Sequence, residues 1–282
     1  MKKIKSIIFT FILIFNSNLA LSAEKIDLLK VDWSFNGLFG TFDRGSLQRG
    51  YQVYTEVCAS CHSMKHLSYR NLAQEGGPEF SLEEAKAIAA SFIVVDGPDE
   101  YGEMFERPGK LSDKFVNPYL NDNEAKSANG GAYPPDMSVL VKARGGGANY
   151  LYSVLNGYEE PPANIELDDG VYYNKYMYGN KIKMANPLDD GIVEYNDGTD
   201  ATIEQMSKDV VTFLTWAAEP HLETRHKIGF RSNLKVATTN PPNTPIIFPI
   251  NTRKGTAIID AKSLVVIRNC IGLVDKVSKA SI

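Results

Sequence analysis

The chain has 282 residues, of which 43% are hydrophobic and 23% charged, and its formal net charge at pH 7 is −4. Residues 24–230 carry 19 Lys and Arg against 32 Asp and Glu, a net charge of −13, whereas residues 231–282 carry 8 against 2. The length and composition fit one large or two small globular domains with a buried core. The acidic body argues against a nucleic-acid partner, because phosphates require a basic surface.

The first 23 residues have the layout of a secretory signal peptide. Three lysines within the first five residues precede an apolar run over 7–15, and small residues follow up to Ala23. The run is too short to span a bilayer, so we expect cleavage near Ala23 and a mature protein outside the cytoplasm. Three cysteines are too few for the disulfide scaffold of a small exported protein.

Two helices are predicted in the first part of the mature chain. Asp43 leads into a helix whose apolar residues recur at helical spacing up to Val57 and which runs directly into Cys58. Ser81 and Glu84 form a capping-box pattern ahead of a second helix that extends to residue 92.

The middle of the chain is predicted to consist mainly of long loops. Residues 96–183 are rich in Gly, Pro, Asn and Tyr, apart from two short helices within 135–158 that are broken by the glycines at 145–147. Loops of this length usually carry function or wrap a ligand. Thr202 begins a last helix that stops at Pro220. The predicted fold class is therefore mainly α.

The segment Cys58-Ala-Ser-Cys61-His62 is the attachment motif of a c-type haem. On one helical turn the two thiols lie on one side and can add to the two vinyl groups, while His62 becomes the first axial ligand of the iron. Zinc would need a second Cys/His pair, and a thioredoxin-like pair would need a βαβ context. A plain disulfide remains an alternative.

The sixth iron ligand is less tightly specified by the residues alone. Met64 and His66 are too close to His62 to reach the opposite face of the ring, and Met206 belongs to the apolar face of a helix. Met184 lies in an extended loop that contains a proline, and we favour it because such a loop can lie across the ring. Other candidates that remain are Met137 and, for a bis-histidine site, His221. Arg144, ahead of three glycines, is a candidate partner for a haem propionate.

Several segments, taken together and in order, resemble the cytochrome c1 family, the haem subunit of the ubiquinol–cytochrome c oxidoreductase of bacteria and mitochondria. They are VCASCHSM at 57–64, NGGAYPPDMS at 129–138, ARGG at 143–146, the segment 150–162, MANPL at 184–188, YNDGT at 195–199 and KDVVTFLTWAAEP at 208–220. The resemblance covers residues 32–230. It implies a cytochrome c-like haem domain with long loop insertions.

The resemblance also implies roles for individual residues. Met184 occupies the position of the axial methionine, and Arg144 that of an arginine near a propionate. Pro134, Pro135 and Tyr150 match residues that line the haem pocket. The implied cofactor is one covalent haem c, held by Cys58 and Cys61 and ligated by His62 and Met184.

By the same resemblance, the chain receives electrons from the Rieske iron–sulfur protein and passes them to a soluble cytochrome c. Its other partner is cytochrome b, and it works on the periplasmic side of the inner membrane. The soluble carrier is usually basic, which suits the acidic body, and the acidic stretch 96–103 is a candidate docking surface. The subunit is not catalytic alone.

One part of the chain departs from the family. The family continues after this point into a transmembrane anchor, whereas residues 231–282 are polar, basic and interrupted by proline. We therefore divide the chain into a signal peptide (1–23), a haem domain (24–230) and an atypical tail (231–282), either a replacement or the product of a frame change. We expect no site in the tail, and Cys270 to be incidental. Membrane association would then come through the complex.

Two other functions stay open on the residues. A free soluble periplasmic c-type electron carrier would need no anchor. A haem enzyme such as a peroxidase would need an open position on the iron.

Overall fold

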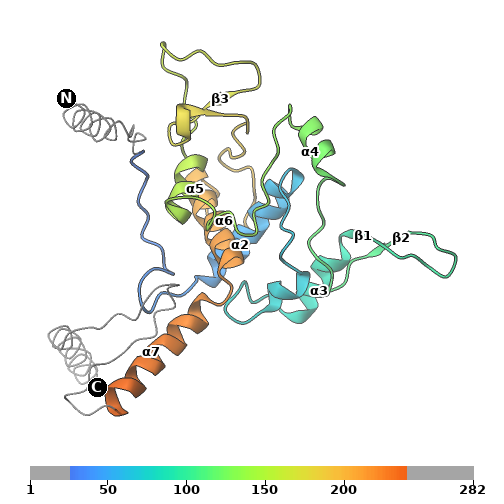
Figure 1. Cartoon of the computed structure of the whole chain (residues 1–282), viewed down its shortest axis with the longest axis vertical. Helices are drawn as coiled ribbons and strands as arrows, with labels where there is room; N and C mark the ends of the chain where they lie inside the picture. The colour runs from blue at the N-terminus through green and yellow to red at the C-terminus, as the bar shows by residue number, and fades with distance from the viewer. Residues whose placement is uncertain (1–25, 240–282) are drawn as a thin grey trace, which may run out of the picture. The chain divides into compact units, whose positions relative to one another are not determined.

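The structure is a computed structural model that describes residues 26–239 (Figure 1). The chain divides into two compact units after Leu222, and each is described by itself. The elements of the first unit are α2 (Arg44–Glu56), α3 (Leu82–Ala90), β1 (Ile93–Asp96), β2 (Phe105–Pro108), α4 (Asp122–Ala128), α5 (Gly147–Leu155), β3 (Tyr172–Tyr173), β4 (Lys181–Ile182) and α6 (Ile203–Ala218), with short 3₁₀ turns at Cys58–Ser60, Tyr69–Ala73 and Tyr178–Asn180. The regular structure is mostly helical, as predicted.

The helices α2, α3 and α6 begin where their capping signals predict. Asp43, Ser81 and Thr202 each accept a hydrogen bond from the backbone N–H three residues later, at 2.7, 3.1 and 3.2 Å. At α3 the carboxylate of Glu84 also accepts from the N–H of Ser81 at 2.8 Å, which completes the capping box. Local sequence is sufficient at these three positions, because donor and acceptor lie within one turn.

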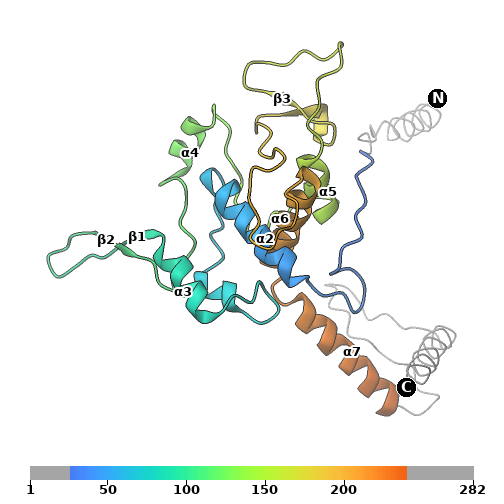
Figure 2. The ribbon, with the colours of Figure 1, turned by 180° about the vertical axis from the view of Figure 1, so that it is seen from behind.

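The core of the first unit is built on α6, against which both α2 and α5 pack (Figures 1 and 2). The side chains of Phe213 and Trp216 on α6 are completely buried. Gly50 of α2 sits at the crossing with α6, where an added Cβ would lie 2.1 Å from the carbonyl oxygen of Asp209 and 2.8 Å from Cβ of Phe213. The two helices therefore approach as closely as they do because residue 50 has no side chain.

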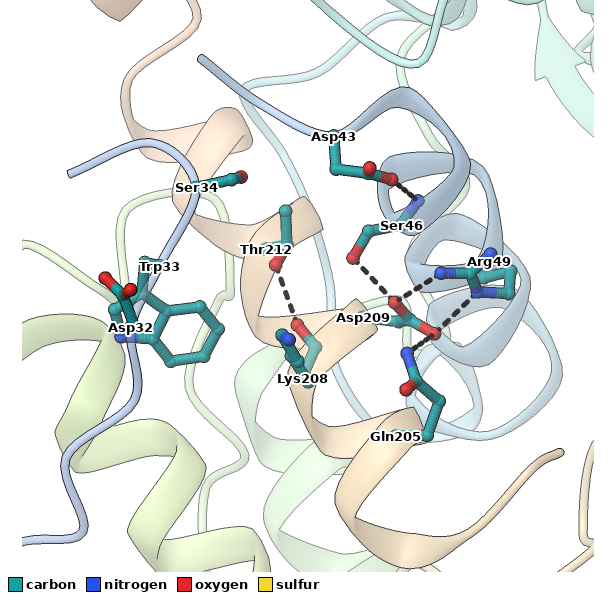
Figure 3. Close-up of a pocket in the computed structure, with 10 residues that line it drawn as sticks. All are labelled: Asp32, Trp33, Ser34, Asp43, Ser46, Arg49, Gln205, Lys208, Asp209 and Thr212. Carbon is teal, nitrogen blue, oxygen red and sulfur yellow. Dashed lines mark hydrogen bonds and ion pairs between the residues drawn. The ribbon is translucent and has the colours of Figure 1, made fainter. Parts of the chain in front are cut away.

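A buried ion pair fastens the same two helices together (Figure 3). Asp209 of α6 is fully buried, and its carboxylate accepts from Nε of Arg49 at 2.8 Å, from the hydroxyl of Ser46 at 2.6 Å and from the amide of Gln205 at 3.0 Å. Arg49 also donates to Asp197 at 2.7 Å. These bonds raise the pKa of Arg49 above its ordinary value, although burial opposes them. The network borders a pocket of about 370 Å³. Because its charged groups are paired with one another, we assign the network a structural role.

A two-stranded antiparallel hairpin follows α3. Residues Ile93 and Asp96 of β1 lie opposite Pro108 and Phe105 of β2. Arg107 joins the hairpin to the chain beyond it, because it forms ion pairs with both Asp96 and Asp113. The tip of this hairpin contains the acidic stretch 96–103, whose residues are mostly exposed.

The prediction of two short helices within 135–158 is wrong for the first of them. Residues 138–143 form turns instead, and α5 begins only at Gly147. Leu140 and Val141 are nevertheless buried. Their apolar spacing therefore reflects contact with the core, not an α-helix. The region between Pro135 and the glycines is also short, and a short helix gains few hydrogen bonds to offset the cost of starting it.

The chain beyond α5 is organised around one buried amide. Asn174, just after β3, is fully buried; its side chain donates to the carbonyl of Val154 at 2.8 Å and accepts from the N–H of Tyr176 at 3.1 Å. It also forms an isolated antiparallel bridge with Tyr158. The two-stranded pairing of β3 with β4 and the segment that leads to Met184 are thereby fixed to the end of α5.

The second unit is described only as far as residue 239. Helix α7 (Leu222–Thr239) continues through residue 230, so the change in composition there is not a boundary of secondary structure. Among residues 26–239, no helix combines the length and the apolar character that crossing a bilayer requires. The predicted signal peptide, most of the predicted tail and Cys270 lie outside the described residues.

Candidate functional site

The two motif cysteines stand at the end of α2. Val57 ends the helix, and a 3₁₀ turn follows in which the carbonyl of Cys58 accepts from the N–H groups of Cys61 at 3.1 Å and His62 at 2.9 Å. Both cysteines are free thiols with partial exposure. Burial, together with the nearby Cys61, raises the pKa of Cys58 to about 12, so its sulfur is a neutral thiol. The structure does not join Cys58 and Cys61 in a disulfide.

His62 is buried and held in one orientation. Its Nδ1 lies 2.8 Å from the carbonyl oxygen of Pro135. A carbonyl oxygen can only accept, so Nδ1 carries the proton and Nε2 presents a lone pair. Burial lowers the pKa of His62, against the opposing effects of the Pro135 hydrogen bond and of Asp136. The imidazole is therefore neutral at pH 7, which is the form that binds a metal.

The Pro135 carbonyl belongs to a loop that is clamped onto the motif. The carboxylate of Asp136 accepts from the hydroxyl of Ser63 and the N–H of Lys65, both at 2.8 Å, and from the N–H of Ser138 at 2.9 Å. Burial alone would raise the pKa of Asp136, but these hydrogen bonds outweigh it and hold the pKa below its ordinary value. The carboxylate is charged at neutral pH.

Met184 is half-buried two residues after β4, in the extended segment that the sequence predicts. Its carbonyl oxygen accepts from the hydroxyl of Tyr158 at 3.1 Å. Tyr150 on α5 donates to Sδ of Met177 at 3.4 Å, a methionine that sequence reasoning did not weigh. The structure thus joins Pro135 to His62 and Met184 to Tyr158. The role of Met184 as an iron ligand stays a prediction.

The remaining predicted contacts are less constrained. Arg144 is exposed, and its guanidinium donates to the neighbouring carbonyl of Ala143 at 3.2 Å, so its role at a propionate also stays a prediction. Pro134 is half-buried beside Pro135. The glycine at 146 has a structural explanation: its φ is +89°, and an added Cβ would lie 2.4 Å from the side chain of Leu28.

The other possible ligands differ clearly in burial. Met64 and Met206 are completely buried in the core, as expected for Met206. His66 and His221 are exposed, and Met137 is half-buried. Within the described range, no three His, Cys, Asp or Glu side chains gather as they would around a metal ion, which leaves the zinc alternative without a ligand set there.

Sequence reasoning missed three residues that hold the site. They are Asp136, Tyr158 and Asn174, and each acts through a bond to a distant segment. Asp136 lies inside the PPDMS segment that carries the family resemblance, and this was a signal for the residue. Nothing in the sequence indicated its hydrogen-bond partners.

Comparison with known proteins places the chain in a family. The sequence model of the Cytochrome C1 family matches residues 33–240. "Cytochrome c1 1, heme protein, mitochondrial" of Arabidopsis thaliana is 53% identical over 199 residues, which are 71% of this chain and 64% of that protein. The yeast Saccharomyces cerevisiae has a "Cytochrome c1, heme protein, mitochondrial" that is 50% identical over 201 residues, with the same two coverages.

A bacterial relative is longer still. "Cytochrome b/c1" of Bradyrhizobium diazoefficiens is 48% identical over 218 residues, which are 71% of this chain and 32% of that protein. The chain thus spans less than two thirds of the length of these three relatives. The family's sequence model covers well over half of the chain, and these relatives are about 50% identical to it. The chain therefore belongs to the cytochrome c1 family.

Proposed function

We propose that this chain carries one covalent haem c and passes single electrons as a subunit of the ubiquinol–cytochrome c oxidoreductase. Two free thiols stand at the spacing of the attachment motif, directly before a neutral histidine whose Nε2 is available. This donor set fits the group: two sulfurs for thioether bonds and an imidazole for the iron. The family membership of the chain supports the same cofactor.

In this function each residue has a defined task. Cys58 and Cys61 would hold the ring covalently and His62 would ligate the iron through Nε2, while the Pro135 carbonyl keeps that imidazole in one tautomer. Met184 would supply a thioether as the second iron ligand. When bound, the haem supplies a one-electron redox couple, whose potential a methionine ligand raises. Tyr150, Pro134 and Arg144 are assigned to the pocket and propionates by family resemblance.

The proposed partners follow from names and charge. A relative in Candida albicans is named "Cytochrome b-c1 complex catalytic subunit", and the bacterial relative is named "Cytochrome b/c1". We infer that cytochrome b and the Rieske iron–sulfur protein are neighbours of this chain and that the Rieske protein is the electron donor. The net charge of −13 over residues 24–230 supports a basic soluble cytochrome c as the acceptor.

We place the haem domain on the periplasmic side of the inner membrane, exported by residues 1–23, with residues 24–230 as the functional domain. We also infer that the long segments between α3 and α6 are insertions into a cytochrome c-like core. They contain only short elements, α4, α5 and the two hairpins. The division that sets residues 231–282 apart as an atypical tail is part of the same proposal.

The test is to express the full chain in a bacterium that attaches haem c in its periplasm. We expect a c-type pyridine haemochrome spectrum and an intact mass that includes one haem. The double variant Cys58→Ala/Cys61→Ala should lose both signals, and the matched control Ser60→Ala should keep them. A colourless protein with the mass of its amino acids alone would refute the proposal.

A second measurement separates the complex subunit from the free carrier. The chain should co-purify with cytochrome b and Rieske subunits, and its oxidation by a basic cytochrome c should slow as salt concentration rises. A haem-loaded chain that purifies alone would favour the free soluble periplasmic carrier.

A further inference from the structure

A single carboxylate ties together two segments that lie about seventy residues apart. Asp136 Oδ2 accepts from both the Ser63 hydroxyl and the Lys65 N–H at 2.8 Å. Its Oδ1 accepts from the N–H of Ser138 at 2.9 Å. The carboxylate therefore holds the loop that follows Pro135 onto the segment that follows His62.

This clamp lies directly next to the histidine hydrogen bond. Ser63 follows His62, and Asp136 follows Pro135. The clamp and the Nδ1-to-carbonyl hydrogen bond of 2.8 Å are therefore one residue apart in both segments of the chain. The N–H of Met137 donates to the carbonyl of Ser63 at 2.8 Å and closes the same junction from the other side. Ser63 is itself buried, whereas the bond from the Lys65 N–H is exposed.

We propose that Asp136 is a positioning residue for His62, which tunes the reduction potential of the iron bound at Nε2. By fixing the Pro135 carbonyl it keeps the Nδ1–H hydrogen bond short, which makes the imidazole a stronger electron donor. Its negative charge near the site acts in the same direction. Both effects favour the oxidised iron and lower the potential. This inference rests on the proposed haem function.

The test compares variants of the haem-loaded full chain by redox titration. Asp136→Asn removes the charge and weakens the clamp, so we expect a higher midpoint potential. The expected change in the equilibrium constant for reduction is about tenfold, or about 59 mV for a one-electron couple. Ser63→Ala breaks one bond of the clamp without changing any charge. It should shift the potential in the same direction by a smaller amount.

A matched control uses another carboxylate of the same kind. Asp99, in the loop between β1 and β2, accepts from the N–H groups of Tyr101 at 2.8 Å and Glu103 at 2.9 Å. Asp99→Asn makes the same chemical change away from the motif and should leave the potential unchanged. A shift in Ser63→Ala would show that positioning contributes beyond charge.

The outcomes separate this inference from the proposed function. A wild-type chain with covalent haem, and variants whose potentials equal or fall below its value, would overturn the role of Asp136 while leaving the haem function standing. If Asp136→Asn fails to accumulate, Ser63→Ala decides by the same criterion. A wild-type chain without covalent haem would overturn both.

Discussion

Gly50 leaves no room for a side chain where α2 crosses α6. In Gly50→Ala the new Cβ would lie 2.1 Å from the Asp209 carbonyl oxygen, so the backbone must move about 1.3 Å to reach an ordinary contact of 3.4 Å. The alanine gains about 1 kcal/mol of helix propensity, while overpacking against backbone costs about 1–3 kcal/mol or more. Because the obstacle is backbone, we place the overpacking cost at the upper end of this range, and we expect a net loss of about 2 kcal/mol in the free energy of unfolding.

The assay is guanidinium unfolding of the full chain, followed by far-ultraviolet circular dichroism. Gly45→Ala is the matched control, since it lies on the same helix and its added Cβ would meet only the side chains of Arg49 at 3.3 Å and Asp43 at 3.4 Å. It should not lower the free energy of unfolding, because alanine gains helix propensity there, up to about 1 kcal/mol, and meets no backbone obstacle. Equal stability of the two variants would refute the close-crossing argument.

Three further predictions concern other parts of the molecule. Asn174→Ala leaves the N–H of Tyr176 without its acceptor and removes one donor to the Val154 carbonyl, which also accepts from the N–H of Gly157. The substitution should lower the free energy of unfolding by about 2 kcal/mol in a denaturant titration. The Arg107 ion pair holds the pKa of Asp113 at about 2. Since this folded-state pKa is depressed, its stabilisation is present above about pH 4 and is lost as pH falls towards 2; hydrogen exchange of the β1–β2 amides should accelerate over that range. Under the proposed function, Met184→Ala should abolish the sulfur-to-iron charge-transfer band and lower the potential, whereas Met177→Leu should retain the band.

Much of the helical framework is predictable from the sequence because its signals are local. The caps at Asp43, Ser81 and Thr202 each act within one turn, and the structure has all three where they are predicted. The prediction of a helix at 138–143 is wrong because buried apolar residues recur there at helical spacing although the chain forms turns. The β1–β2 hairpin depends on Arg107, whose partners are identified only after the chain has folded.

The candidate site divides in the same way. The attachment motif is contiguous, and so Cys58, Cys61 and His62 are legible in the sequence. The hydrogen bond that fixes the tautomer of His62 comes from Pro135, 73 residues away. A carbonyl acceptor carries no residue-type signature, since every residue has one. Sequence patterns therefore identify the candidate ligands but do not give their supporting contacts.

The anchoring of Asn174 to the end of α5 has a practical consequence for purification. The contacts that hold the segment before Met184 are made by Tyr158 and Asn174, and residues 168–170 between them are exposed. An affinity tag inserted at 168–170 therefore lies in a loop whose two ends, at Tyr158 and Asn174, are held by the contacts described above. It provides a handle for isolating the protein without a tag at either end of the chain.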